Sequence, residues 1–302
     1  MDETRVLQVD AFTDEPLAGN PAGVVPDADG LEDEQLQAIA REMAVSETAF
    51  LQSEPDSEAD WRIRYFTPSQ EVDLCGHATV ASFGVLHEEG VLSTGTTTFE
   101  TNVGVLECRV DEDGTVWMTQ DAPTIDAVEV EYGTVADALG VEREALEGAS
   151  ADLPLAVSST GLPFLVVPIT YLSDVGNAQP DMAAVEALTD RVDAAGVYLF
   201  TFDTLEGDST LHARMFAPGA GVPEDPVTGT ASGAVGAYLE RYGAFDPFPE
   251  ELRLEQGHYL ERPGLVRVRV DGAAVRVGGR AVGSLEGTIV VPPAPDDDIL
   301  EV

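Results

Sequence analysis

The chain has 302 residues, of which 44 % are apolar and 24 % charged, and its 56 acidic and 15 basic side chains give a formal net charge of −41. Nucleic acid is excluded as the default partner, because binding to phosphate backbones needs clustered Lys and Arg. All the basic residues are arginine, and the lack of lysine excludes both Schiff-base chemistry on a lysine and a P-loop.

The first half of the chain contains three predicted elements. Apolar residues recur at helical spacing over 36–43, after an acidic start, and predict a helix. The segment that follows Gly76 is small or apolar on nearly all sides, which is typical of a buried helix. Alternating apolar residues over 106–110 precede Asp113-Gly114 and predict a strand that enters a tight turn.

The second half repeats these elements in the same order. Helical spacing over 182–188, a small and apolar segment after Gly229, and an alternating run over 266–270 before Asp271-Gly272 match the three elements of the first half. Short words recur as well, and the matched pairs are 64–68 with 214–218, 76–79 with 229–232, and 104–111 with 264–271. An ordered repeat of this kind indicates two similar halves. We therefore expect an α+β fold in which each half curls an antiparallel or mixed sheet around one central helix, with a second helix outside.

Polar side chains gather ahead of both predicted buried helices. A buried helix start presents unpaired N–H groups and the positive end of the helix dipole, so it favours an anion. If the two starts face each other, the cleft between the halves would bind one small substrate, with a carboxylate expected. The alternative is that four side chains only cap their own helices: Asp73, Asp225, Thr228 and Thr230.

Glu47 stands in an apolar, strand-like run over 45–51, and its counterpart in the second half is Val197. Burial of a lone carboxylate is costly unless the group is paired or used. Desolvation would raise the pKa of Glu47 toward neutrality, which suits a group that accepts and releases a proton. The alternative is that Glu47 lies on a solvated face of the strand.

Five segments together resemble the phenazine biosynthesis-like (PhzF-type) isomerase family: Asp10–Thr13, Gly19–Val24, Ser46–Phe50, Asp73–Thr79 and Glu224–Ala231. The likeness covers essentially the whole chain. It implies a diaminopimelate-epimerase-like fold of two pseudo-symmetric, barrel-like halves with the site between them. The expected N-terminal half is 1–120 with a returning strand at about 283–302, and the expected C-terminal half is 121–282.

The resemblance implies a cofactor-independent isomerase that moves a proton between carbons of a small carboxylate-bearing substrate. Glu47 would be the acid/base, with His77 and Asp225 holding the polar groups of the substrate and assisting the transfer. Four further residues would line the site through hydroxyl or backbone donors: Ser46, Gly76, Gly229 and Thr230. The family often has Ser at the position of Thr230. The resemblance also implies a homodimer.

Two alternative functions remain open, and the first depends on Cys75. It falls where related racemases and epimerases have one of two catalytic thiols, so one alternative is an amino-acid racemase or epimerase that uses Cys75. The matching stretch 225–228 has no cysteine, however, and we expect Cys75 and Cys108 to be small buried residues. The other alternative is a non-catalytic relative that binds a small molecule.

No metal site is expected, because Cys75-x-His77 has no second ligand pair at a suitable spacing. Arg64 and Arg214 could bind a substrate carboxylate, but their repeated position favours a structural role in each half.

The sequence shows no targeting segment or membrane span. Its start lacks a basic region followed by an apolar one, and no stretch approaches 18 uninterrupted apolar residues. The two cysteines are too few for a secreted disulfide framework. We expect a soluble, cytoplasmic protein with no membrane partner.

The acidic residues are spread through every segment, which favours adaptation of the surface to high salt over one cationic partner. Salt would screen the mutual repulsion of these carboxylates, so the folded state should gain stability as salt is added. We predict that the thermal unfolding midpoint rises between low and molar KCl. A midpoint that stays constant over this range would contradict the interpretation.

Overall fold

The computed structural model describes residues 2–53, 55–149 and 153–293, and these form two compact units. Unit 1 contains the described residues of 1–17, 21–117 and 280–302, and unit 2 contains those of 18–20 and 118–279. The returning C-terminal strand expected at 283–302 corresponds to β18, Ala281–Val290, while residues 294–302 lie outside the described part.

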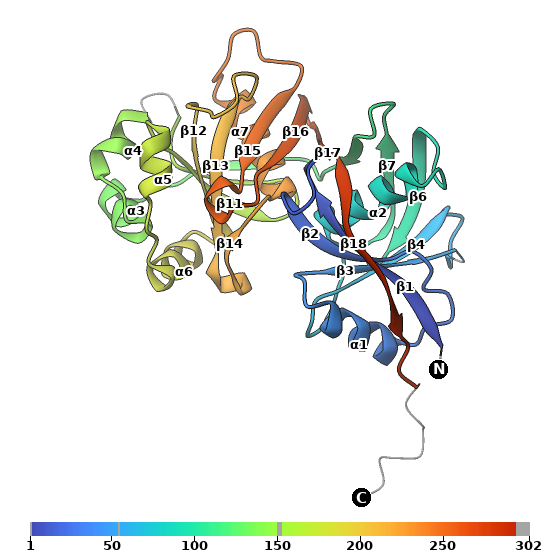
Figure 1. The fold of residues 1–302 in the computed structure, drawn as a ribbon. Helices are drawn as coiled ribbons and strands as arrows, with labels where there is room; N and C mark the ends of the chain where they lie inside the picture. Colours follow the sequence, from blue (N-terminus) through green and yellow to red (C-terminus); the bar gives the residue numbers. More distant parts are fainter. Residues whose placement is uncertain (1, 54, 150–152, 294–302) are drawn as a thin grey trace, which may run out of the picture. The chain divides into compact units, whose positions relative to one another are not determined.

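In its described residues, unit 1 combines a mixed sheet with the helices α1 (Asp33–Met43) and α2 (Gly76–Glu88) (Figure 1). Strand β2 begins at Asn20, which belongs to unit 2, and β8 runs across the boundary at residues 117 and 118. Besides β18, the strands are β1 (Glu3–Ala11), β2 (Asn20–Val25), β3 (Thr48–Gln52), β4 (Trp61–Phe66), β5 (Glu71–Val72), β6 (Gly95–Thr101), β7 (Gly104–Val110) and β8 (Val116–Thr119).

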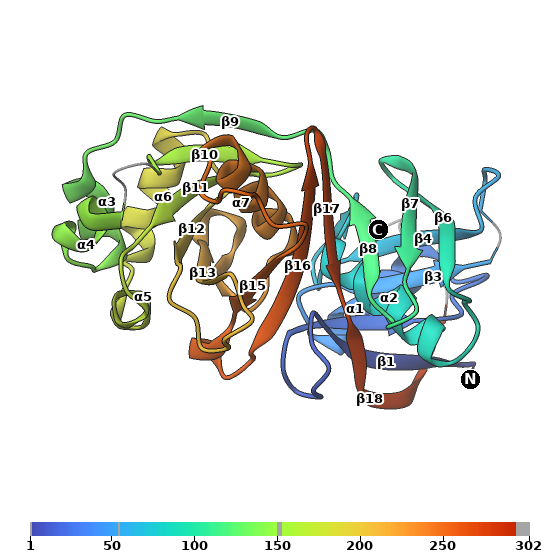
Figure 2. The same ribbon diagram turned by 90° about the horizontal axis from the view of Figure 1, so that it is seen from above.

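Unit 2 also combines a mixed sheet with helices, and its central helix is α7 (Gly229–Arg241) (Figure 2). Its strands are β9 (Thr124–Ala127), β10 (Ala156–Ser159), β11 (Pro163–Pro168), β12 (Gly196–Thr201), β13 (Leu211–Ala217), β14 (Val222–Asp225), β15 (Leu252–Gln256), β16 (Gly264–Asp271) and β17 (Ala274–Gly279). The other helices are α3 (Tyr132–Leu139), α4 (Arg143–Ala149), α5 (Leu172–Asn177) and α6 (Met182–Arg191), with short 3₁₀ turns at Pro218–Ala220 and His258–Leu260.

The order of strand pairings is the same in the two units. In unit 1, β2 and β3 are parallel, β3 and β4 antiparallel, β4 and β6 parallel, and β6 and β7 antiparallel. In unit 2, β11 and β12 are parallel, β12 and β13 antiparallel, β13 and β15 parallel, and β15 and β16 antiparallel. The sheets are therefore mixed. Strand β1 pairs along its whole length with β18, Glu3 opposite Val290.

The helices predicted from apolar spacing are present. Helices α1 and α6 cover 36–43 and 182–188, and the two predicted buried helices are α2 and α7, which begin at Gly76 and Gly229. Helix α2 contacts β1, β3, β7 and β18, and α7 contacts β9, β10, β11, β16 and β17, so each is surrounded by strands of its own unit. The turn after β16 pairs Asp271 with Ala274, as its Asp-Gly pair predicts.

Glycines let strands approach these central helices closely. A Cβ on Gly84 of α2 would lie 2.7 Å from the Cβ of Ala281. On α7, a Cβ on Gly233 would lie 2.8 Å from Val277 Cγ2, and one on Gly236 would lie 2.6 Å from Val268 Cγ1. Because such distances are shorter than van der Waals contact, Gly84, Gly233 and Gly236 are packing positions.

Among the described residues, no helix has both the length and the apolar character that crossing a bilayer requires.

We predict that Gly236→Ala lowers the free energy of unfolding by about 1–3 kcal/mol, because its methyl group would overlap a stiff valine of β16. The matched control is Gly133→Ala in α3, where no atom lies within 4 Å of the added Cβ, so stability should be unchanged or slightly higher. Urea titrations followed by circular dichroism measure both. Equal effects of the two substitutions would contradict the packing argument.

Candidate functional site

The first turn of α2 is fixed by a chain of buried hydroxyl groups in unit 1. Thr79 donates its hydroxyl proton to the carbonyl of the N-cap residue, Cys75, at 2.7 Å. Its oxygen lies 2.7 Å from the phenol oxygen of Tyr65, which must therefore be the donor of that second bond. Tyr65 is fully buried, and burial raises the pKa of its phenol, so the donor proton is retained at neutral pH.

The first turn of α7 in unit 2 is built in the same way. Ser232 donates to the carbonyl of its N-cap residue, Thr228, at 2.9 Å, and Tyr198 lies 3.2 Å from the Ser232 hydroxyl. Burial also raises the pKa of Tyr198. At both of these described helix starts, the N-cap side chain makes no capping hydrogen bond. The N-cap side chains therefore do not occupy the first N–H groups of these helices, which is the condition for anion binding expected from the sequence.

In unit 1 the fold brings three side chains together around the His77 ring. Glu47 Oε2 lies 3.5 Å and Ser46 Oγ 3.4 Å from His77 Nε2, and Cys75 Sγ lies 3.4 Å from His77 Nδ1. The side chains of His77 and Glu47 are 13 % and 24 % exposed, so both are recessed but remain in contact with solvent. A carboxylate beside an imidazole in such a position is suited to proton transfer. Gly76 is the first residue of α2, next to His77.

Glu47 lies one residue before β3 rather than within a strand. Helix α1 ends at Met43, its C-cap residue Ala44 adopts a left-handed conformation (φ 53°), and the chain turns before it enters the sheet. The N–H of Gly23 donates to the Glu47 carbonyl at 2.9 Å. A Cβ on Gly23 would lie 2.5 Å from Thr48 Oγ1, so only glycine allows β2 to approach this closely. The expectation that Glu47 is part of a strand was wrong, because the left-handed turn ends the helix late and delays the strand.

In unit 2 both carboxylate oxygens of Asp225 are bound. Asn20 donates its side-chain amide to Asp225 Oδ1 at 2.9 Å and to the Val227 carbonyl at 2.8 Å, and Thr228 donates its hydroxyl to Asp225 Oδ2 at 2.5 Å. These bonds fix the orientation of the carboxylate at the end of β14. Gly229 begins α7, and Thr230 follows it, with its carbonyl accepting a bond from Thr160 at 3.2 Å.

Two supporting residues were missed by the sequence analysis. Asn20 is 1 % exposed and lies in the Gly19–Val24 segment, but nothing local to that segment indicates a bond to a residue 205 positions away. Gln256 donates to the Asp225 carbonyl at 2.8 Å and to Thr228 Oγ1 at 3.1 Å. Both side-chain amides hold the loop between β14 and α7. A single sequence gives no signal for them, because their partners lie far away in the chain.

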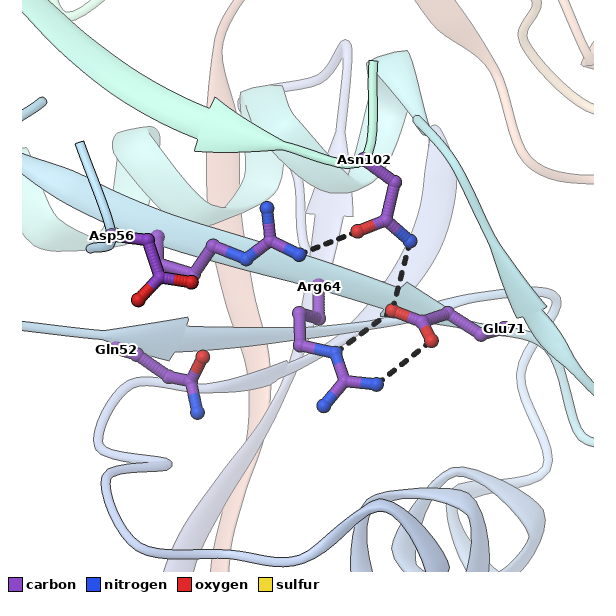
Figure 3. Close-up of a pocket in the computed structure, with 6 residues that line it drawn as sticks. Gln52, Asp56, Arg64, Glu71 and Asn102 are labelled. Carbon is purple, nitrogen blue, oxygen red and sulfur yellow. Dashed lines mark hydrogen bonds and ion pairs between the residues drawn. The ribbon is translucent and has the colours of Figure 1, made fainter. Parts of the chain in front are cut away.

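Arg64 and Arg214 have structural roles. Arg64 binds both oxygens of Glu71 at 2.8 Å (Figure 3). It also donates to Asp33 at 2.6 Å. The hydrogen bonds from Arg64 outweigh partial burial and hold the pKa of Glu71 below its ordinary value. Arg214 binds both oxygens of Glu224 at 2.8 Å, in the same bidentate way. Their repeated position thus reflects a repeated ion pair.

A polar cavity of about 270 Å³ lies beside Arg64 in unit 1 (Figure 3). Asn102 links the two arginines of the cavity, Arg62 and Arg64. The Asn102 side-chain oxygen accepts from Arg62 at 2.5 Å, and its amide donates at 3.1 Å to Glu71, which binds Arg64. The lining residues are Gln52, Asp56, Arg62, Arg64, Glu71 and Asn102, and they include none of the predicted site residues. Glu100 pairs with Arg62 and Glu71 pairs with Arg64, so both arginines are already neutralised. We therefore interpret the residues around this cavity as a structural network and not as an anion site.

A buried glutamate supports β15 just before Gln256. Glu255 is 2 % exposed and accepts hydrogen bonds from His212 Nδ1 at 2.8 Å and from the N–H groups of Leu205 at 3.0 Å and Glu206 at 2.7 Å. Burial alone would raise the pKa of Glu255, but these hydrogen bonds outweigh it and lower the pKa to about 2. Glu255 is therefore ionised at neutral pH. The next residue, Gln256, bonds to Asp225 and Thr228 in the loop that precedes α7, so Glu255 supports that loop indirectly.

Residues 9–287 match the model of the family described as "Phenazine biosynthesis-like protein". The chain belongs to the phenazine biosynthesis-like (PhzC-PhzF) family. The resemblance inferred from its motifs is thereby confirmed.

Bacterial members of this family are similar to the chain over nearly its whole length. The uncharacterized isomerase YfhB of Bacillus subtilis is 38 % identical over 295 residues, 96 % of this chain and 97 % of that protein. The crystal structure of a Bacillus anthracis PhzF-family protein has a TM-score of 0.87 at 34 % identity and covers 96 % of this chain and 100 % of that one. A hydroxyproline epimerase from Agrobacterium vitis, at a TM-score of 0.60 and 14 % identity, covers 96 % of this chain and 91 % of its own, and shows that the family shares its fold with epimerases.

For this PhzF-family chain we predict that Glu255→Gln lowers the free energy of unfolding at pH 7 by about 2 kcal/mol, because an ionised acceptor of three bonds is lost. Since the folded-state pKa lies below the ordinary value of 4.5, the stabilisation by Glu255 is complete above about pH 4.5 and disappears as the pH falls toward 2.

Urea titrations at constant KCl should therefore show a gap between wild type and Glu255→Gln that is steady near neutrality and narrows in acid. Glu250→Gln, which changes an exposed glutamate near the start of β15, is the control and should show no gap. A gap of constant size down to pH 3 would be inconsistent with the lowered pKa.

Proposed function

We propose that this protein is a cofactor-independent isomerase that moves a proton between two carbons of a small carboxylate-bearing substrate. One observation carries the proposal: Glu47 Oε2 lies 3.5 Å from His77 Nε2, and both side chains are recessed. A relative in the same family, YfhB, is named an isomerase, which supports this interpretation. Glu47 is the acid/base of the reaction. It removes a proton from one carbon, the double bond shifts, and the proton is returned to another carbon, so that atoms and charge balance.

His77 assists this transfer and holds a polar group of the substrate. Its Nε2 faces both Glu47 and Ser46, so the ring can stabilise the Glu47 carboxylate or orient it through one hydrogen bond. The first turn of α2, beginning at Gly76, supplies N–H groups for the substrate carboxylate. Asp225, Gly229 and Thr230 enter the proposal through the family resemblance, together with the pseudo-symmetry of the halves and the homodimer.

A second candidate is an amino-acid racemase or epimerase that uses the thiol of Cys75. It is favoured by one contact, that of Cys75 Sγ with His77 Nδ1 at 3.4 Å, because an imidazole can accept the thiol proton and leave a thiolate. Racemisation by proton transfer from two faces needs a second acid/base, and the stretch of unit 2 that matches Cys75 contains no cysteine. We therefore rank it below the Glu47 isomerase.

The test of the isomerase is solvent deuterium exchange into a panel of small unsaturated and amino carboxylic acids, followed by mass spectrometry. We predict that Glu47→Gln slows exchange by about 100-fold to 10 000-fold, because the amide cannot accept the proton. Glu42→Gln, which changes an exposed glutamate of α1, is the control and should exchange at the wild-type rate.

The outcomes separate the candidate functions. Equal exchange by wild type and Glu47→Gln removes Glu47 from the mechanism. Loss of exchange in Cys75→Ala, with exchange retained in Glu47→Gln, would favour the thiol racemase. A ligand that raises the unfolding midpoint of the wild type without any exchange would indicate a binding protein instead of an enzyme.

A further inference from the structure

Three side chains that can ligate a metal meet beside the first turn of α2 in unit 1. One carboxylate oxygen of Glu47, the Sγ of Cys75 and one ring nitrogen of His77 all lie within 4.8 Å of one another. The Glu47 oxygen is 3.5 Å and the Cys75 sulfur 4.0 Å from His77 Nε2. The sequence could not indicate this set, because Cys75-x-His77 supplies only two ligands and Glu47 comes from the turn after α1.

Two of the three separations are close to the edges of a zinc tetrahedron, and the third is bounded at 4.8 Å. With Zn–S near 2.3 Å, Zn–N near 2.05 Å and Zn–O near 2.1 Å, a tetrahedral ion places its N and O ligands about 3.4 Å apart and its N and S ligands about 3.6 Å apart. The observed O–N and S–N distances, 3.5 Å and 4.0 Å, differ from these by less than a small side-chain rotation would change them.

The backbone on both sides of the cluster is held in place. The Cys75 carbonyl accepts the Thr79 hydroxyl, and the Glu47 carbonyl accepts the Gly23 N–H. The ligands are thus presented by fixed segments of a single unit, and a metal ion would need little rearrangement of the chain.

The donor set selects the class of metal. Thiolate and imidazole ligands favour zinc and its neighbours, whereas magnesium and calcium take oxygen ligands. Three protein ligands leave a fourth position open for water or for an oxygen of a bound acid.

We propose that Glu47, Cys75 and His77 form a binding site for a divalent transition metal of the zinc class, and that occupation of this site stops proton transfer. On binding, the Cys75 thiol releases its proton to solvent and its sulfur bonds to the metal, while Glu47 and His77 donate lone pairs. The Glu47 carboxylate is then no longer available as a base. Inhibition rests on the proposed isomerase function, whereas metal binding does not.

Cobalt(II) tests the binding directly, because a cobalt–thiolate bond produces a charge-transfer absorption. The full-length protein is titrated with Co²⁺ in high KCl and excess Mg²⁺, which occupies oxygen-only sites on the acidic surface. We predict a saturable charge-transfer band in the wild type that Zn²⁺ abolishes. The band should be absent in Cys75→Ala and Cys75→Ser, and Glu47→Gln should weaken binding by about tenfold or more.

Cys108→Ala is the matched control, because Cys108 is a second buried thiol, on β7, that belongs to no such ligand group in the described part of the chain. It should keep the band. Thermal unfolding followed by circular dichroism establishes that each variant is folded. Absence of the band in the wild type, or its persistence in both Cys75 variants, would overturn the metal site.

The proposed inhibition by the bound metal is tested in the deuterium-exchange assay. With wild-type protein, saturating Zn²⁺ should abolish deuterium exchange, and removal of the ion with a chelator should restore it. Exchange that continues at full rate with Zn²⁺ bound would overturn the inhibition. If no substrate exchanges at all, the isomerase proposal fails, while the cobalt spectra still decide whether the metal site exists.

Discussion

The candidate chemistry depends on how firmly two buried helix starts are fixed. In each unit a fully buried tyrosine donates to a hydroxyl in the first turn, and that hydroxyl donates to the carbonyl of the N-cap residue. The bonds satisfy polar groups that burial would otherwise leave unpaired, and they leave the N-cap side chains uninvolved in capping. A helix start that is rigid and open in this way can present N–H groups to a small anion without rearrangement.

Three well-bonded glutamates differ from Glu47 in their surroundings. Arg64 binds Glu71 and Arg214 binds Glu224, whereas Glu255 is bound by His212 and by two backbone N–H groups. Glu47 is different, because its carboxylate lies beside an imidazole while part of its side chain stays exposed. A structural carboxylate is paired with fixed donors in the protein. A carboxylate that exchanges a proton with a substrate must instead remain accessible to that substrate.

Much of the fold could be predicted from sequence because its signals are local. Helical and alternating spacing identified α1, α2, α6, α7 and the turn between β16 and β17, and the repeated Arg64 and Arg214 proved to be repeated ion pairs. What could not be predicted involves partners far apart in the chain. The bonds of Asn20 and Gln256 around Asp225, and the approach of Cys75 to His77 and Glu47, have no periodicity that a sequence could reveal. The placement of Glu47 outside β3 depended on one left-handed residue, Ala44, which is not a residue type that favours that conformation.

The pairing of the first strand with the last has a consequence for the order of assembly during synthesis. Glu3 lies opposite Val290, so β1 leaves the ribosome long before its partner β18 exists. Every strand of unit 2 is translated in that interval, and this unit can complete its contacts while the sheet of unit 1 still lacks a member. A released chain that ended before β18 would therefore contain every strand of unit 2, while β1 would keep one edge open to other chains.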